Sequence, residues 1–230
     1  MKYIYAVIIF ISFSSTVFSA PSYSVIFYGA TAENLSEADK DYDEAVRLSA
    51  RANLPNNEML GRAFSLYKSA AERGHVFAMH NLARSYRNGK FSSIDYKEAF
   101  EWYLNAAKFG FAGSQNNLGD MYESGEGVTQ SYADAVYWYT KAAMQGEPTA
   151  YLSLGTIYKD GLGVQRNLVE SAFWLMLARA HLKDGLNLKD ANTALSEVSK
   201  LINSEQLKEA ELRARLFKPL NQTRVTLEDR

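Results

Sequence analysis

The sequence predicts an all-α protein, a right-handed α/α superhelical solenoid made of stacked helix pairs. Two observations lead to this prediction. Three blocks of 36 residues, 75–110, 111–146 and 147–182, align with one another without a gap. Within each block, apolar residues recur at the three- and four-residue spacing of an amphipathic helix. Because one helix pair cannot bury its own apolar face, successive pairs must stack on one another.

The aligned positions of the three blocks combine large apolar residues with small ones. They are Leu82, Leu118 and Leu154, then Ala83, Gly119 and Gly155, then Tyr86, Tyr122 and Tyr158 in the first halves, and Trp102, Trp138 and Trp174, then Ala106, Ala142 and Ala178 in the second halves. The leucine and the tyrosine of a block are four residues apart, so they share one helical face and predict a buried stripe. The small residue between them would let a neighbouring helix approach closely. This register predicts that the tyrosines and tryptophans belong to the core and do not form a platform for stacking sugars.

Two sets of glycines predict where the helices end. One set closes successive blocks and supplies the left-handed residue that ends a helix: Gly74, Gly110 and Gly146. The other set predicts the turn between the two helices of a pair: Gly125, Gly127, Gly161 and Gly163. Gly-x-Gly also occurs in phosphate-binding loops, but these turns follow a helix and lack a Lys-Ser/Thr, so we interpret them as structural.

The N-terminus predicts a secretory signal peptide over residues 1–19. It has a basic start at Lys2, an apolar run over 4–13 and small polar residues after the run. The run is too short to cross a bilayer as a helix, which takes roughly 20 residues. We expect cleavage after Ser19, with cleavage after Ala20 or an uncleaved N-terminal anchor as the alternatives. A cleaved chain would be periplasmic or secreted and would not insert into a membrane.

The remaining segments flank the three aligned blocks. We expect an extended arm over 20–38, a degenerate first repeat over 39–74, two amphipathic capping helices over 183–218 and a flexible tail over 219–230. The degenerate repeat would begin after a capping pattern at Ser36. A solenoid needs a polar outer cap, which the charged residues of the last predicted helix suit.

Composition excludes several classes of site. The chain has no cysteine, and its formal charge is −1. It therefore has no disulfide, thiolate metal site or cysteine nucleophile, and no basic character that would suggest nucleic acid. The histidines offer no metal site, because His75 and His80 are five residues apart and His181 is alone. No Gly-x-Ser-x-Gly elbow occurs. We expect no enzyme activity, no catalytic residue, no cofactor and no metal.

The repeat carries a family resemblance. The segments 118–128 and 133–143 resemble the Sel-one-like repeat, a 36-residue relative of the tetratricopeptide repeat, and 154–164 matches nearly as well. The first block departs where Lys90 and Phe91 replace the Gly-Val of the turn, and the third block departs after Trp174. The resemblance implies a protein-interaction scaffold, because related proteins are adaptors in many pathways.

The resemblance also implies where a partner would bind. In tetratricopeptide relatives the first-helix face opposite the buried stripe lines the concave groove. A 100° step per residue places the following residues on this face: Phe77, His80, Arg84, Arg87, Asn88, Asn116, Asp120, Glu123, Leu152, Thr156 and Lys159. The first block is basic here and the second acidic, which would favour a partner of complementary charge. The alternative is that these side chains are solvated and form salt bridges between adjacent repeats.

Three classes of function remain open. The leading hypothesis is an exported, monomeric module that binds a partner protein, as a toxin-neutralising immunity protein or as a virulence or host-interaction factor. A cell-envelope structural scaffold is an alternative. An enzyme resembling the penicillin-binding, β-lactamase-like members of the family is the third, but those members carry a cysteine pair in each repeat and this chain has no cysteine.

Overall fold

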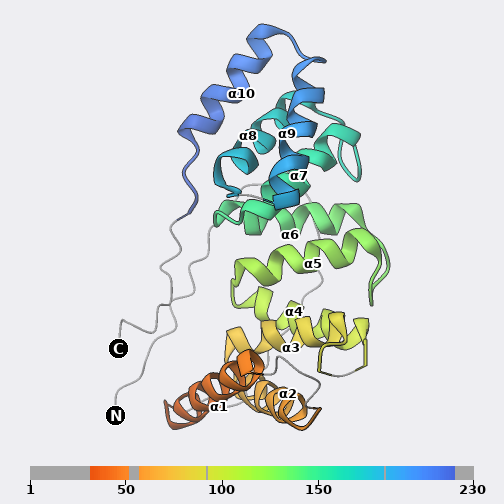
Figure 1. Cartoon of the computed structure of the whole chain (residues 1–230). Helices are drawn as coiled ribbons and strands as arrows, with labels where there is room; N and C mark the ends of the chain where they lie inside the picture. Colours follow the sequence, from red (N-terminus) through yellow and green to blue (C-terminus); the bar gives the residue numbers. More distant parts are fainter. Residues whose placement is uncertain (1–31, 52–56, 92, 184, 221–230) are drawn as a thin grey trace.

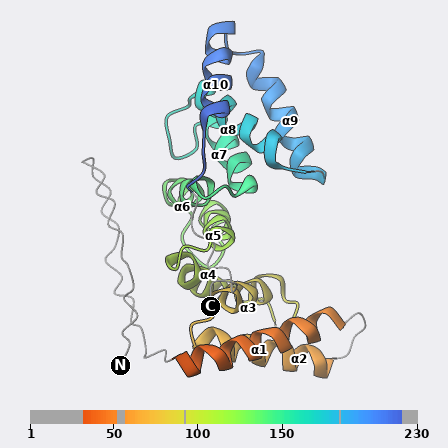
Figure 2. The same cartoon turned by 90° about the vertical axis from the view of Figure 1, so that its left-hand side faces the viewer.

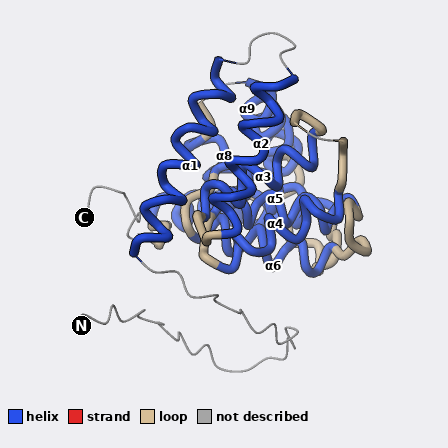
Figure 3. Tube along the Cα trace, turned by 90° about the horizontal axis from the view of Figure 1, so that it is seen from below, coloured by secondary structure: helices blue, strands red, loops and turns tan. Residues whose placement is uncertain are grey.

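The computed structural model describes residues 32–51, 57–91, 93–183 and 185–220. These residues form ten helices joined by loops, and no strand occurs among them (Figure 3). The helices are α1 (Ala32–Arg51), α2 (Asn57–Glu72), α3 (Val76–Asn88), α4 (Tyr96–Lys108), α5 (Ala112–Ser124), α6 (Tyr132–Met144), α7 (Pro148–Asp160), α8 (Leu168–His181), α9 (Gly185–Ser199) and α10 (Ser204–Leu216). The first eight form four pairs that stack in chain order (Figure 1). The prediction of an all-α repeat solenoid is confirmed.

The beginning of the first helix corrects the predicted arm. Helix α1 starts at Ala32, so the expectation of an extended segment is wrong for residues 32–38. The reason is the apolar pattern, since Ala38 and Ala45 are seven residues apart, lie on one helical face and are both fully buried. The predicted signal peptide and the rest of the arm lie outside the described residues.

The predicted tail is corrected at its first residues. The N–H of Leu220 donates a hydrogen bond to the carbonyl of Met144 at 2.7 Å, and Pro219 packs beside Gly146. The chain therefore returns after α10 to the end of α6. Residues 221–230 lie outside the described part of the chain.

The core runs through the whole stack. Leu82, Leu118 and Leu154 are fully buried, as their spacing predicts. The most buried aromatic residues of the second helices are Tyr103 and Tyr139, one position after the tryptophans. The tryptophan positions differ from one another: Trp102 and Trp138 are only partly buried and pack against the edge of the core, whereas Trp174 is buried. The three tryptophans therefore do not line an open platform.

Small residues set the distances between helices. A Cβ built at Gly119 would lie 2.6 Å from the Tyr139 ring, and one at Gly155 would lie 2.6 Å from Leu175. Because glycine has no side chain, the two helices of each pair can approach closely at these positions, as the sequence predicts. The turn glycine Gly127 has a φ of +71°, and a Cβ there would lie 2.2 Å from the backbone oxygen of Tyr96. This glycine lets the turn of one pair rest on the second helix of the preceding pair.

The last two helices close the C-terminal end of the stack. Both α9 and α10 pack against α8, and α9 also contacts α7. Helix α10 begins with a capping box, in which Asn203 and Gln206 exchange side-chain and backbone hydrogen bonds. Viewed from the side, α1 at one end and α9 at the other project toward the same side of the stack, which is therefore concave there (Figure 2).

Candidate protein-binding face

The candidate face consists of the exposed sides of the first helices α3, α5 and α7, together with the parts of α1 and α9 that adjoin them. Side-chain contacts link α3 to α1 and α5 at one end of this face, and α7 to α9 at the other end. Phe77 of α3 lies 6.2 Å from Tyr42 of α1 and 5.1 Å from Phe111 at the start of α5, measured between ring centroids. Lys159 of α7 forms an ion pair with Glu197 of α9 at 3.0 Å.

An aromatic patch occupies the α1–α3–α5 end of this face. It consists of Phe77 and the three rings that surround it, those of Tyr42, His75 and Phe111. The Phe77 side chain is 41% exposed although its neighbours are aromatic. An exposed aromatic side chain held by other rings is typical of a binding anchor.

His75 is a structural residue that the face prediction did not include. Its Nδ1 accepts the N–H of Ala78 at 3.1 Å and so caps α3, while its ring stacks on Tyr42 with centroids 4.2 Å apart. Its Nε2 lies 3.6 Å from an oxygen of Asp39. Burial lowers the pKa of His75, and Asp39 acts in the opposite direction. The sequence signal was its position directly before a predicted helix.

His80 is mostly buried between repeats, although the sequence predicts it on the exposed face. Its Nδ1 and the Oγ of Ser114 share a hydrogen bond at 2.9 Å, and its ring contacts Tyr103 and Phe111 edge to face. Burial lowers its pKa to about 4, and the nearby charge of Arg84 contributes to the shift. His80 therefore joins α3 to α5 and offers little surface to a partner.

Arg87 also joins neighbouring repeats. Its Nε donates to Glu126 at 2.7 Å, and its guanidinium lies 3.5 Å from Asp120 and donates to Asn117 at 3.3 Å. Only 21% of this side chain is exposed. These contacts tie α3 to α5 and to the turn that follows α5.

The two acidic residues of the middle repeat are held by a buried phenol. The hydroxyl oxygen of Tyr139 lies 2.8 Å from Asp120 and 2.7 Å from Glu123, so its single hydrogen is shared between the two carboxylates. Burial raises the pKa of Asp120, while the Tyr139 hydrogen bond and Arg87 lower it. Burial beside the two carboxylates raises the pKa of Tyr139 as well.

The charges of this face thus divide into two kinds. Arg87 and Asp120 form an ion pair across two repeats, which agrees with the alternative of salt bridges between adjacent repeats, whereas Glu123 is hydrogen-bonded to Tyr139 of its own repeat. Arg84 differs, because it is exposed and forms no ion pair among the described residues. Asn88 is exposed, whereas the side-chain oxygen of Asn116 is buried without a hydrogen-bond partner in the described part of the chain.

The α7 part of the face lies beside the cap. Leu152, Thr156 and Lys159 line a pocket of about 190 Å³ together with residues of α9: Asp190, Thr193, Ala194 and Glu197. The structure therefore brings these three predicted residues together, next to α9. A partner that follows the face from α3 would meet α9 at this point.

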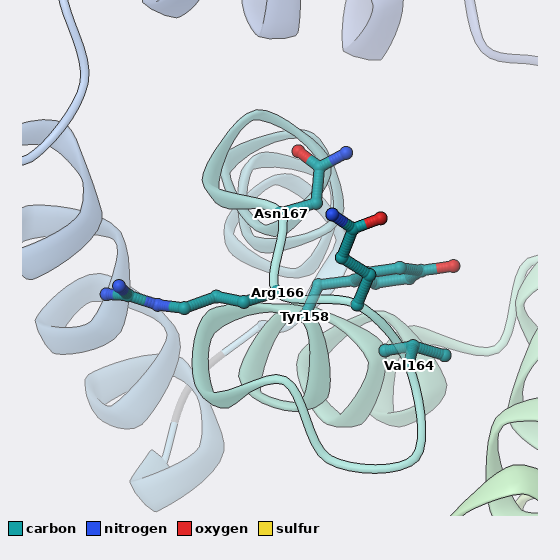
Figure 4. Close-up of a pocket in the computed structure, with 5 residues that line it drawn as sticks. Tyr158, Val164, Arg166 and Asn167 are labelled. Atoms are coloured by element: carbon teal, nitrogen blue, oxygen red, sulfur yellow. The ribbon is translucent and has the colours of Figure 1, made fainter.

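A second pocket, of about 340 Å³, lies between the end of α7 and the start of α8 (Figure 4). Its lining residues are Tyr158, Val164, Gln165, Arg166 and Asn167. The Arg166 side chain extends away from Tyr158 and Val164, and its Nε donates to the carbonyl of Lys159 at 2.9 Å. This pocket presents no pair of acidic or basic groups for catalysis. Within the described ranges, no three His, Asp or Glu side chains gather as a metal site.

None of the helices in the described part of the chain combines the length and apolar character needed to cross a membrane. The stacked pairs and their continuous face define a helical-repeat solenoid of the kind that serves as an interaction scaffold. Four stretches, 55–75, 76–110, 112–147 and 148–180, match the family described as Sel1 repeat. Because these stretches cover more than half of the chain, the protein belongs to the Sel1 repeat family, which is a family of protein-interaction scaffolds.

Solved structures give the same assignment. A protective antigen of uropathogenic Escherichia coli strains, with an SLR fold, is 31% identical over 77% of this chain, with a TM-score of 0.68. A Sel1 repeat protein from Oxalobacter formigenes is 27% identical over 67% of this chain, with a TM-score of 0.52. This chain spans 37% of the first relative's length and 63% of the second's.

An immunity protein from Pseudomonas aeruginosa is 23% identical over 78% of this chain and 80% of its own, with a TM-score of 0.37, so it supports no conclusion about function. No curated protein sequence matches the chain.

Proposed function

We propose that this protein is an exported interaction module that binds a partner protein through the concave face formed by α3, α5 and α7. The observation that carries the proposal is the aromatic patch around Phe77, two helical turns before Arg84, which is exposed and forms no ion pair among the described residues. Aromatic side chains, phenylalanine among them, and arginine are enriched at protein interfaces. Both residues belong to α3, on the face that the repeat pattern predicts to be concave.

Export is part of the same proposal. It is supported by the predicted signal peptide over residues 1–19 and by the likeness to a protective antigen, a class of protein that the host immune system encounters. The location would then be the periplasm or the outside of the cell. Among the roles considered, the antigen favours a host-interaction role over toxin neutralisation.

The test is capture of the partner by the mature chain and by a variant of the concave face. The variant carries Phe77→Ala, Asn88→Ala and Thr156→Ala, which alter three positions of α3 and α7 without breaking an ion pair of the described residues. We expect the variant to retain its helical circular dichroism and to lose at least about tenfold in affinity, as for loss of a hot-spot residue.

The matched control alters the second-helix side of the stack. Asp134→Ala and Tyr137→Ala replace exposed residues of α6. The proposal requires that this control binds the partner as the parent does. Equal capture by parent and concave-face variant, or loss of capture only in the α6 control, would show that the partner binds elsewhere.

A further inference from the structure

Two tyrosines at equivalent positions of neighbouring repeats differ in their hydrogen bonds. Tyr103 of α4 and Tyr139 of α6 are 36 residues apart, and both are almost completely buried. The Tyr139 hydroxyl has two carboxylates of α5, Asp120 and Glu123, as acceptors for its single hydrogen. The Tyr103 hydroxyl is buried and has no partner within the described residues. A buried hydroxyl without a partner is unfavourable and needs an explanation.

The difference arises from the residues that face each tyrosine. At the positions of Asp120 and Glu123, the preceding repeat has Arg84 and Arg87. A guanidinium has only donors and cannot accept the hydrogen bond of a phenol. Because Asp120 contacts Tyr139, the repeat register places Arg84 at the position that faces Tyr103. Burial raises the pKa of Tyr103 to about 12, and the charges of Arg87 and Arg84 act in the opposite direction. The repeat therefore holds the donor but lacks the acceptor.

Only one of the two arginines is free. Arg87 is held by Glu126 and Asp120, whereas Arg84 is exposed and forms no ion pair in the described part of the chain. A free guanidinium is suited to bidentate pairing with a carboxylate. A carboxylate is also the group that satisfies the equivalent tyrosine in the next repeat.

We propose that the Arg84–Tyr103 position binds a carboxylate side chain of the partner protein. The carboxylate pairs with the Arg84 guanidinium and accepts the hydrogen bond of the Tyr103 hydroxyl, as Asp120 does for Tyr139 within the chain. This inference rests on the proposed function and adds the chemistry of the partner. Because the hydroxyl is buried, binding requires a rotamer change at this position, which Arg84 can make without breaking an ion pair.

The aromatic patch gives a second requirement for the partner. Phe77 precedes Arg84 by seven residues, two helical turns or about 10 Å along the axis. An extended segment covers that distance in about three residues. The partner segment therefore carries an acidic residue and an aromatic or large apolar residue about three positions apart.

The experiment titrates the mature ¹⁵N-labelled chain with four blocked tetrapeptides and follows its amide resonances. The probes are acetyl-Phe-Gly-Gly-Glu-amide and acetyl-Glu-Gly-Gly-Phe-amide, which cover both chain directions, and the same two peptides with Gln in place of Glu. We expect one Glu peptide to shift resonances of α3 and to bind at least about tenfold more tightly than its Gln counterpart. We expect added salt to weaken this preference.

Two variants test the two proposed contacts. Arg84→Gln removes the charge and abolishes the preference for Glu over Gln, and Tyr103→Phe removes the hydroxyl and reduces that preference several-fold. Lys141→Gln, which removes an exposed cation of α6, leaves the preference unchanged. Urea unfolding of each variant shows that the fold is retained.

Three outcomes overturn the inference: equal binding of Glu and Gln peptides, full preference in Tyr103→Phe, or no binding of any peptide at about 10 mM. Each leaves the proposed function standing if partner capture still depends on Phe77, Asn88 and Thr156. If capture is also indifferent to those residues, both proposals fall.

Discussion

The hydroxyl of Tyr139 donates a 2.8 Å hydrogen bond to the carboxylate of Asp120, a residue of the other helix of the same pair. Glu123 lies 2.7 Å from the same hydroxyl and shares its hydrogen. These bonds satisfy a buried donor and hold two carboxylates that would otherwise be free to pair with a ligand. The acidic middle of the candidate face is therefore engaged within its own repeat.

Replacement by phenylalanine should destabilise the protein at Tyr139 but not at the equivalent Tyr103. Tyr139→Phe removes the shared hydrogen bond and leaves the partly buried Asp120 with one fewer partner, so the free energy of unfolding should fall by about 1–3 kcal/mol. Tyr103→Phe removes a hydroxyl that has no partner in the described part of the chain, so the free energy of unfolding should stay within about 0.5 kcal/mol or rise. Urea unfolding followed by tryptophan fluorescence measures both. A larger loss in Tyr103→Phe would mean that its hydroxyl is bonded in solution.

Gly119, which lets α5 and α6 approach closely, should be sensitive to a larger side chain. Gly119→Ala places a Cβ 2.6 Å from the Tyr139 ring, which must move. We expect a net loss of about 1–2 kcal/mol, although alanine favours the helix by about 1 kcal/mol. Gly61→Ala in α2 is the matched control, because nothing lies within 4 Å of the built Cβ. That control should stabilise the protein. Equal changes in the free energy of unfolding for the two substitutions would show that the space between α5 and α6 can accommodate the added methyl group.

Much of this packing could be predicted from the sequence, since Leu82, Gly119 and Gly127 recur in register and each has one structural role. The repeat period indicates which residues share a face, but it does not indicate how far neighbouring pairs are rotated against each other. That rotation decides that His80 is covered by Phe111 and that Arg87 reaches Glu126. The exposed residues of the candidate face were therefore predictable only in part.

The two arginines of α3 also differ in their predicted contribution to stability. Arg87→Ala removes a 2.7 Å ion pair with Glu126 and leaves Asp120 with one fewer partner, so we expect a loss of about 1–2 kcal/mol. Arg84→Ala removes an exposed side chain that forms no ion pair with the described residues, and should change the free energy of unfolding by less than about 0.5 kcal/mol. Thermal or urea unfolding of both variants distinguishes them. If Arg84→Ala proves as costly as Arg87→Ala, then Arg84 has a partner within the folded chain.

Burial of His80 predicts that stability falls in mild acid. Its pKa in the folded state is about 4, below the ordinary value of 6.5, so the unfolded chain binds the proton more tightly. The stabilising contribution is therefore complete above pH 6.5 and declines as the pH falls toward 4. The shift corresponds to at most about 3 kcal/mol. His75, whose pKa is also lowered, adds an effect of the same sign.

A substitution taken from the next repeat isolates the His80 contribution. His80→Asn introduces the residue that stands at the equivalent position, Asn116, and cannot take up a proton in this range. The difference in unfolding free energy between parent and variant, measured in urea at intervals from pH 7 to pH 4, should shift in favour of the variant as the pH falls. His181→Asn at an exposed position of α8 controls for loss of a histidine as such. A difference between parent and His80→Asn that is constant with pH would mean that His80 takes up its proton equally well in the folded chain, and that the contact between α3 and α5 leaves it open to water.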